Sequence, residues 1–553
     1  MGKGTYDLDS ILNEIGQFGA FQILSCTLIC LPIIFNGIDT LTYIFTASGV
    51  EHRCRINECD LDNSGIQAYL PPWINNSVPF ENGVPSKCTR YKPYNNSDNL
   101  YDGSNHSEFC PADLFDQTAI VSCNEFIYKG DERTIATEWD LSCPNDAWKL
   151  TLIGTLNNIG QFIGVPLGGY ISDGYGRRTT MALTGTIAAM MGIIRSFSVN
   201  YAMFAVLETL DAAIGSVVYP TAMVLGMELV GPEKRVLATT ILAVFYPVGE
   251  VLMGVVAKYV TNWRDFLRVL YIPGLLHILF FWIITESVRW LLVKGKYEEA
   301  IRALKKAAKF NKVSLSEESL EELCSSSELY KDTSEEVPSE SYPIRSAFAS
   351  TKLLCRIVNC SFCWFTNTLV YYGLSLNSVS LAGDKYLNFI FVCLIEVPGF
   401  LICYFTTNSL GRKPSQSGSL IISGVACLLS HFINDNQPWL AFILFLVGKL
   451  AITVSFTVLY VYTSELFPTN LRQSLLSFCS MFGRIGSMIA PQTPLLAQFL
   501  PSLPLILFGS CAISSGLLVL KFPETLNITL PTTVADAENI GEKGFKKRKA
   551  EIS

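Results

Sequence analysis

Long apolar stretches separated by short polar segments run through most of the chain. A helix needs about 20 apolar residues to cross a bilayer, and twelve stretches are close to that length. They lie near residues 20–45, 148–171, 179–197, 201–227, 236–260, 268–286, 353–376, 386–407, 415–433, 439–462, 474–499 and 504–522. This pattern predicts twelve membrane-spanning helices.

Three longer polar segments interrupt the series, at residues 49–147, 287–351 and 523–553. Six spans lie on either side of the central segment, within 20–48 and 148–286 and within 352–522. Two six-span halves are the arrangement of a transporter built from two repeats. The chain is therefore predicted to be an all-α membrane protein made of two six-helix bundles.

Positive charge predicts which side of the membrane each loop occupies. Basic pairs occur in short loops that share one side of the twelve-span arrangement: Arg177 with Arg178, Lys234 with Arg235, and Arg412 with Lys413. Lys and Arg concentrate in cytoplasmic loops. Residues 1–19, 287–351 and 523–553 are therefore expected to be cytoplasmic, with both termini inside, and residues 49–147 are expected outside.

The segment 49–147 has the composition of an extracellular loop. It contains six cysteines and three N-x-S sequons, at Cys54, Cys59, Cys88, Cys110, Cys123 and Cys143 and at Asn75, Asn95 and Asn105. The cysteines predict up to three disulfides, with fifteen alternative pairings, and the sequons predict N-glycosylation. Sixteen acids against seven bases give the loop a net charge of −9. That charge indicates either a vestibule that concentrates cations or a solvated, glycosylated surface.

Composition excludes several other classes of protein. Half of the 553 residues are hydrophobic and only 16% are charged, whereas soluble domains carry roughly a quarter. A net charge of −7 and a pI of 5.4 leave no basic surface for nucleic acid. The four histidines form no zinc-ligand or triad pattern, and no G-x-x-x-x-G-K-[ST] sequence is present. We therefore expect no enzyme, no metal site and no cofactor, with Na+ coupling left open.

A glycine-arginine turn recurs at equivalent places in the two halves. One copy, residues 169–178 (GYISDGYGRR), follows span two, and the other, residues 408–413 (NSLGRK), follows span eight. Glycine permits the tight turn, and Asp173 can cap a helix start and pair with arginines of a neighbouring helix. Such an ion pair would latch one state of a rocking carrier and release the other.

These repeats resemble the signature loops of the major facilitator superfamily. Four further segments narrow the resemblance to the solute carrier 22 family of organic ion transporters: residues 137–143, 285–291, 364–374 and 464–472. The resemblance runs from about Ile15 to Thr525. It implies the major facilitator fold, alternating access between the bundles, small organic ions as substrates and a place in the plasma membrane. It does not imply an oligomeric state.

The resemblance also assigns gating or scaffold roles to charged residues and glycines at the cytoplasmic helix ends. These residues are Asp173, Gly176, Arg177, Arg178, Glu228, Glu286, Arg289, Gly411, Arg412, Glu465 and Arg472. The sequence departs from the family where Thr285 and Val288 replace prolines, where Asn408 replaces an acid, and where Glu208 replaces an arginine. These departures indicate a divergent branch near the carnitine transporters, expected to be invertebrate.

Charged side chains within the spans point most directly to function, because each costs at least ~2.5–3.5 kcal/mol at mid-bilayer. The candidates are Asp39, Glu208, Asp211, Glu250, Glu396, Lys449 and Arg484. Glu208 and Asp211 are three residues apart on one helical face. They form either a cation-coupling site or, for Glu208, an ion pair with a base in the same half. Glu250 is a third candidate for cation coupling.

The resemblance places Arg484 where the family sets substrate charge, with an acid in the pure cation transporters and arginine in the anion and carnitine types. An arginine fork suits a carboxylate, although a structural ion pair with an interior acid is the alternative. Other family positions near the central cavity are Tyr219, Trp364, Tyr371, Tyr372, Lys449 and Glu396. The aromatic rings among them could hold a methylated ammonium.

The sequence thus predicts a polyspecific carrier of small organic ions. Carnitine-like zwitterions and organic cations rank first, because Arg484 and the interior acids could hold both ends of such a solute. Organic anions are the alternative within this class. A channel or a solute-sensing receptor is the rival from another class, although the repeated signature loops argue against it.

Overall fold

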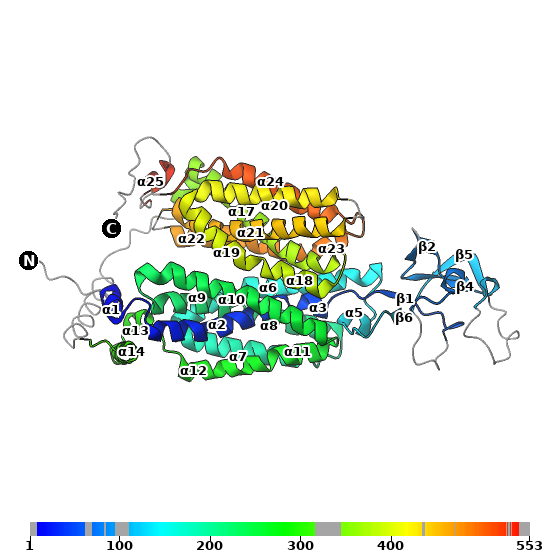
Figure 1. Cartoon of the computed structure of the whole chain (residues 1–553), viewed down its shortest axis with the longest axis horizontal. Helices are drawn as coiled ribbons and strands as arrows, with labels where there is room; N and C mark the ends of the chain where they lie inside the picture. Colours follow the sequence, from blue (N-terminus) through cyan, green and yellow to red (C-terminus); the bar gives the residue numbers. More distant parts are fainter. Residues whose placement is uncertain are drawn as a thin grey trace, which may run out of the picture.

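The computed structural model describes residues 8–60, 69–81, 84–94, 110–315, 344–433, 437–468, 471–526, 528, 531 and 534–540. Two helical bundles lie side by side, one built from each half of the chain (Figure 1). Helices α1 (Leu8–Ile15) and α25 (Val534–Glu538) lie at one end, and a small β-rich domain projects from the other. We call these the tail end and the loop end.

Every predicted apolar stretch is helical over most of its length. The first bundle contains α2 (Ala20–Leu41) with α3 (Tyr43–Thr46), α6 (Pro144–Tyr175), α7 (Arg177–Arg195), α8 (Tyr201–Gly215) with α9 (Val218–Leu229), α10 (Arg235–Tyr259), and α11 (Trp263–Tyr271) with η4 (Pro273–Leu279) and α12 (Phe280–Ile283). The second contains α17 (Thr351–Asn377), α18 (Lys385–Leu394) with α19 (Glu396–Ser409), α20 (Arg412–His431), α21 (Pro438–Leu466), α22 (Arg472–Ile489) with η6 (Ala490–Gln492) and α23 (Thr493–Leu496), and α24 (Leu503–Val519).

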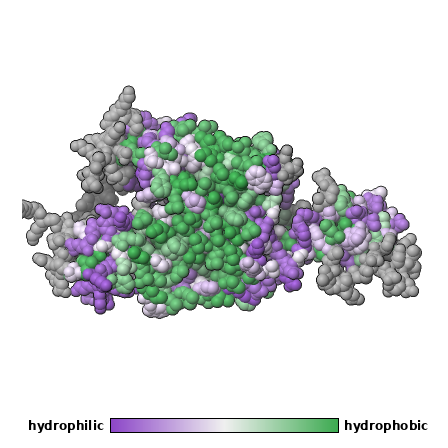
Figure 2. Space-filling model, in the orientation of Figure 1, coloured by the Kyte–Doolittle hydropathy of each residue, from purple (hydrophilic) through white to green (hydrophobic). Residues whose placement is uncertain are grey.

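Seven helical runs among the described residues are long and apolar enough to cross a membrane by length and composition. Figure 2 shows an apolar belt over both bundles between polar ends, as a surface in contact with lipid requires. The chain is therefore a multi-pass membrane protein, and the full count of twelve spans stays a prediction. Of the other helices, α24 is apolar but shorter, and several are more polar. In α20, for example, Gln416 donates to the Ser455 hydroxyl at 2.8 Å and Ser417 to the Gly516 carbonyl at 2.8 Å.

Small residues let α6 and α8 pack closely. Gly160, Gly164 and Gly168 recur every four residues along α6, so they line one side of the helix. A Cβ atom at Gly164 would lie 1.8 Å from the Ala213 carbonyl oxygen of α8. Close approach at small residues is the usual means of helix association in lipid, where helices gain nothing from the hydrophobic effect.

The described part of the loop-end domain contains three two-stranded antiparallel sheets. They pair β1 (His52–Cys54) with β6 (Phe126–Tyr128), β2 (Phe80–Glu81) with β3 (Val84–Pro85), and β4 (Thr89–Pro93) with β5 (Phe115–Ser122). The disulfides join Cys54 to Cys123, Cys59 to Cys110, and Cys88 to Cys143, which selects one of the fifteen pairings. Asn75 is exposed on α4 (Ile74–Ser77), whereas Asn95 and Asn105 lie outside the described residues.

We expect removal of one disulfide, by Cys59→Ser with Cys110→Ser, to loosen this domain, because such a small core depends on its crosslinks. Loss of a disulfide from a small extracellular domain costs roughly 2–5 kcal/mol. Limited proteolysis of the purified protein should cut the loop several-fold faster. Cys355→Ser, at an exposed free cysteine, is the control, and equal cleavage rates in the two variants would contradict the prediction.

Candidate functional site

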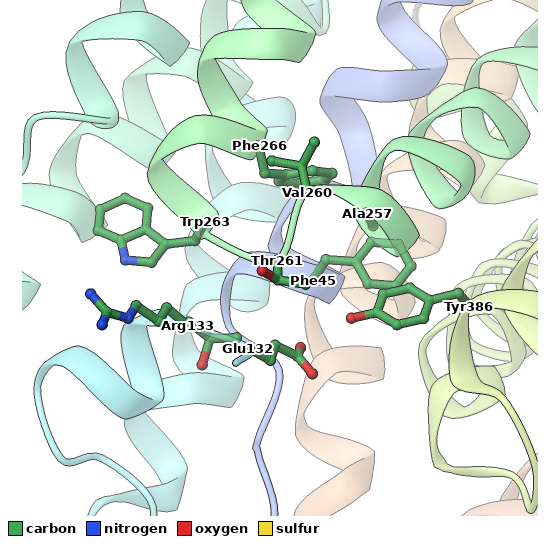
Figure 3. Close-up of a pocket in the computed structure, with 10 residues that line it drawn as sticks. Phe45, Glu132, Arg133, Ala257, Val260, Thr261, Trp263, Phe266 and Tyr386 are labelled. Carbon is green, nitrogen blue, oxygen red and sulfur yellow. The ribbon is translucent and has the colours of Figure 1, made fainter. Parts of the chain in front are cut away.

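The two halves are held together toward the loop end. Among the described residues, the hydrogen bonds and ion pairs between the halves run from the middle of the helices to that end. Lys258 of α10 pairs with Asp384 at 2.9 Å, and Lys385 of α18 pairs with Glu132 at 2.6 Å. Figure 3 shows the residues around a cavity at this junction, where Phe45 lies beside Tyr386. Its volume of about 10 Å³ is close to the minimum for one water molecule, so the two halves pack closely at this point.

At the tail end, ion pairs and a capping carboxylate join helices of the same half. We call this group of contacts the latch of that half. Arg177 pairs with Asp173 at 2.9 Å and with Glu228 at 3.4 Å. Gly176 has φ +102°, which permits the turn between α6 and α7. The carboxylate of Glu286 then accepts the backbone N–H of Arg178 at 3.0 Å. The expected pairing of Asp173 with an arginine of the next helix is present, but the start of α7 is capped by Glu286 and not by Asp173.

The second half repeats this latch with its own residues. Arg412 pairs with Glu465 at 3.1 Å, and Gly411 has φ +103°. The Glu524 carboxylate accepts the backbone N–H groups of Arg412 and Lys413, at 2.9 and 3.1 Å. Glu524 thus occupies the place that Glu286 has in the first half. This role of Glu524 was not predicted from the sequence, although Pro523-Glu524-Thr525 after span twelve repeats the pattern of Thr285-Glu286-Ser287 after span six.

The two remaining gating candidates are Arg289 and Arg472. Arg289 of α13 (Val288–Val293) forms an ion pair with Asp9 of α1. Arg235, at the start of α10, pairs with the same carboxylate at 2.7 Å. Asp9 therefore ties α1, α10 and α13 together. Arg472 begins α22 in the other half.

A fully buried charge cluster occupies the core of the first half. Arg195 of α7 forms an ion pair with Glu208 and lies 3.1 Å from Asp211, both on α8. It also donates to the Tyr271 hydroxyl at 3.0 Å, which in turn donates to Asp39 at 2.5 Å. The structure thus has the second alternative for Glu208, an ion pair with a base of its own half. Three acids surround a single base.

A second buried cluster lies in the other half, where it faces the first half. The Lys449 ammonium lies 2.8 Å from Glu396 and donates to the Ser375 hydroxyl at 2.7 Å. It also lies 3.4 Å from the ring centre of Tyr371, whose hydroxyl donates to Glu396 at 2.7 Å. Lys449 therefore already occupies one face of the Tyr371 ring. Glu250 of α10 approaches this group from the first half, close enough for electrostatic interaction with Glu396 and Lys449.

A chain of hydrogen bonds joins Arg484 to the cluster around Arg195. Arg484 of α22 donates to the Gln161 side chain at 3.1 Å, and Gln161 donates to Asn157 at 2.8 Å. Asn157 donates to the Glu208 carboxylate at 2.8 Å. Both amides lie on α6, so this chain crosses from one half to the other. Arg484 is half-buried, and among the described residues no carboxylate pairs with it.

The predicted aromatic residues divide into two groups. Trp364 and Tyr371 are buried: Trp364 donates to the Thr463 hydroxyl at 3.2 Å and packs against Tyr460. Tyr219 and Tyr372 are partly exposed. Tyr460 is 48% exposed, yet it interacts electrostatically with Tyr219 of the other half and with Arg484. Tyr460 therefore lies near Tyr219 of the other half and near Arg484.

Three features of this site were missed from the sequence. Arg195 is the last residue of α7 and was not among the charged residues identified within the spans, where two bases were recognised beside five acids. The unpaired acids Glu208 and Asp211 were the signal for a third base. Gln161 and Asn157 interrupt an apolar stretch, and costly polar groups at that depth could have marked them. Tyr460 carried no signal apart from its aromatic ring.

Two bundles with matching latches and a charged, aromatic site between them define a transporter that works by alternating access. The family described as "Sugar (and other) transporter" matches residues 90–534. The chain belongs to this family of the major facilitator superfamily, and its curated relatives place it with the solute carrier 22 transporters. It is accordingly a transporter and not an enzyme, as predicted.

The relatives match nearly the whole chain. The chain is 31% identical to the organic cation transporter protein of Drosophila melanogaster, over 98% of this chain and 96% of that protein. It is 30% identical to organic cation/carnitine transporter 2 of Homo sapiens (98% and 96%) and to solute carrier family 22 member 21 of Mus musculus (98% and 95%). A partially occluded, inward-open structure of the xylose transporter XylE from E. coli matches with a TM-score of 0.60 at 15% identity, covering 92% of this chain and 99% of that one. This match confirms the predicted major facilitator fold.

Proposed function

We propose that this transporter carries small organic ions across the plasma membrane, and that a zwitterion with a carboxylate and a quaternary ammonium, such as carnitine, fits its site best. The observation that carries the proposal is the Arg484 guanidinium. It lies at the junction of the halves, its described hydrogen-bond partner is the neutral amide of Gln161, and no described carboxylate neutralises it. An arginine fork in this state can bind both oxygens of a carboxylate.

The ammonium end of the solute would meet aromatic rings. Tyr219, Tyr372 and Tyr460 are at least partly exposed between the halves, and ring faces attract a desolvated ammonium by about 2 kcal/mol or more. Tyr371 is less suited in this conformation, because Lys449 already lies against its ring. The names of the relatives, which include organic cation and carnitine transporters, support the same substrate class.

Uptake of three labelled solutes in transfected cells tests the proposal. Carnitine should be taken up fastest, tetraethylammonium more slowly and a dicarboxylate least. Uptake of the dicarboxylate alone would favour the anion alternative. Preloaded unlabelled carnitine should accelerate uptake of the labelled form, which a channel would not show. Repeating the assay with Na+ replaced by Li+ tests sodium coupling, which stays a prediction.

We expect Gln161→Leu to raise the KM for carnitine about tenfold, with a smaller change in maximal rate. Gln161 holds Arg484 toward the first half, and a hydrogen bond to a charged group contributes roughly 1.5–3 kcal/mol. Concentration-dependent uptake at matched surface abundance measures both parameters. Gln498→Leu, at an exposed position near the loop end, is the control. An unchanged KM would show that Gln161 does not position Arg484.

A further inference from the structure

Glu250 is a buried carboxylate at the surface where the two halves meet. It lies on α10, which packs against α18 and α19 of the other half (Figure 1). One turn further on, a Cβ atom at Gly254 would lie 2.9 Å from Ile390 of α18, so the contact between the halves is tight here. Glu250 is 0% exposed, and among the described residues no N–H or O–H group donates to its carboxylate, which has only the weak thiol donor of Cys393 beside it.

The base that faces Glu250 is already engaged. Lys449 directs its ammonium to Glu396 at 2.8 Å, to the Ser375 hydroxyl at 2.7 Å and to the Tyr371 carbonyl at 3.3 Å. The Ser375 and Tyr371 oxygens accept two of the three N–H groups of the ammonium, and Glu396 is its ion-pair partner. The carboxylates of Glu250 and Glu396 thus have only Lys449 as a positive charge nearby, and Lys449 pairs with Glu396.

Among the residues that the structure describes, the remaining groups that face Glu250 bring no second positive charge. The titratable and charged groups around it are Glu396, Lys449, Cys393, Tyr43, Tyr246, Tyr371 and Tyr372. A buried carboxylate without a partner costs several kcal/mol in its ionised form, and a single bound proton removes that charge without any further ligand. The pair of carboxylates with Lys449 is then electrically neutral.

We propose that Glu250 binds one proton from the loop side each time the halves close at the loop end, and releases it when they part. Closure brings Glu250 against Glu396 and removes water, so the ionised form opposes closure and the protonated form permits it. Parting α10 from α18 would return Glu250 to water and take Glu396 away, which favours the ionised form. The gating role rests on the proposed carrier function, whereas the binding of the proton does not.

Exchange transport at controlled pH tests the gating role. In the wild type, exchange of labelled carnitine should slow by up to about tenfold per unit of external pH once that pH exceeds the midpoint of Glu250, with the internal pH held constant. Glu250→Gln, which is permanently neutral, should show a flat profile at the rate the wild type reaches in acid. Glu233→Gln, at an exposed glutamate of the tail end, should keep the wild-type profile. A Glu250→Gln variant with the wild-type pH dependence would overturn the proposal.

Chemical labelling of the wild-type protein tests the proton site itself. It requires no substrate and no substituted variant. Dicyclohexylcarbodiimide adds to protonated carboxyl groups in apolar surroundings and leaves a stable acylurea. Peptide mass spectrometry of the labelled full-length protein should find the adduct on Glu250, with a yield that falls as pH rises, and not on Glu396. Absence of the adduct on Glu250 at pH 5.5, or labelling of Glu396 in its place, would overturn the proton site. Labelled Glu250 in a protein without carnitine uptake would refute the proposed substrate and leave the proton site standing.

Discussion

Carnitine uptake by an Arg484→Asp variant should fall about 100-fold or more at normal surface abundance. The substitution removes the fork that would bind the carboxylate and places a like charge in its position. Each hydrogen bond between charged groups contributes roughly 1.5–3 kcal/mol, and every 1.4 kcal/mol is a factor of about ten in binding. The variant should retain uptake of tetraethylammonium, which has no carboxylate. Surface biotinylation together with uptake of both solutes measures the effect.

Two controls separate the role of charge from that of shape. Arg484→Lys keeps the charge but loses the planar fork, so we expect an intermediate loss of carnitine uptake, about tenfold. Gln498→Leu should match the wild type. Unchanged carnitine uptake in Arg484→Asp would remove this residue from the substrate site, and equal loss of both solutes would indicate a general defect in the transport cycle.

The fold could be predicted largely because bilayer length and glycine chemistry leave few choices. Twelve apolar stretches of similar length became helices, and the repeated turns at Gly176 and Gly411 have nearly the same backbone angle in the structure, +102° and +103°. The capping acid of the second turn, Glu524, lies 113 residues after Gly411. Only the folded bundle brings these two together, so an inspection of the turn alone could not find it.

The site was harder to predict, because an apolar helix gives little indication of which side faces the interior. Trp364 and Tyr460 are both aromatic residues within apolar spans, yet one is buried and the other is 48% exposed. Packing between helices decides the difference. Arg195 illustrates the same limit: its position at a helix end suggests the membrane surface, but Tyr271 and Glu208 hold it in the core. Acidic residues inside the spans were identified as costly from the sequence, but their partners could not be named.

Arg195→Glu should destabilise the folded transporter by roughly 3–5 kcal/mol, because breaking a buried pair leaves uncompensated charge. Four acids would then lie together with no base. Glu208→Arg alone should also be destabilising, since it places two arginines side by side. Combining the two changes restores one pair with its charges exchanged, and places an arginine where the resembling family usually has one. The double variant should recover most of the lost stability.

Thermal unfolding of the purified protein and surface abundance in cells measure these three variants. The exposed pair of Lys129 and Glu51, 2.6 Å apart at the loop end, provides the matched control. Exposed pairs contribute about 1 kcal/mol or less to stability, so Lys129→Glu should have little effect. Combining it with Glu51→Lys should therefore recover little stability. If Arg195→Glu were no more destabilising than Lys129→Glu, Arg195 would not be the counter-charge of this core. Rescue by the exchange would show that the core of the first half requires a base opposite an acid, whichever helix supplies each.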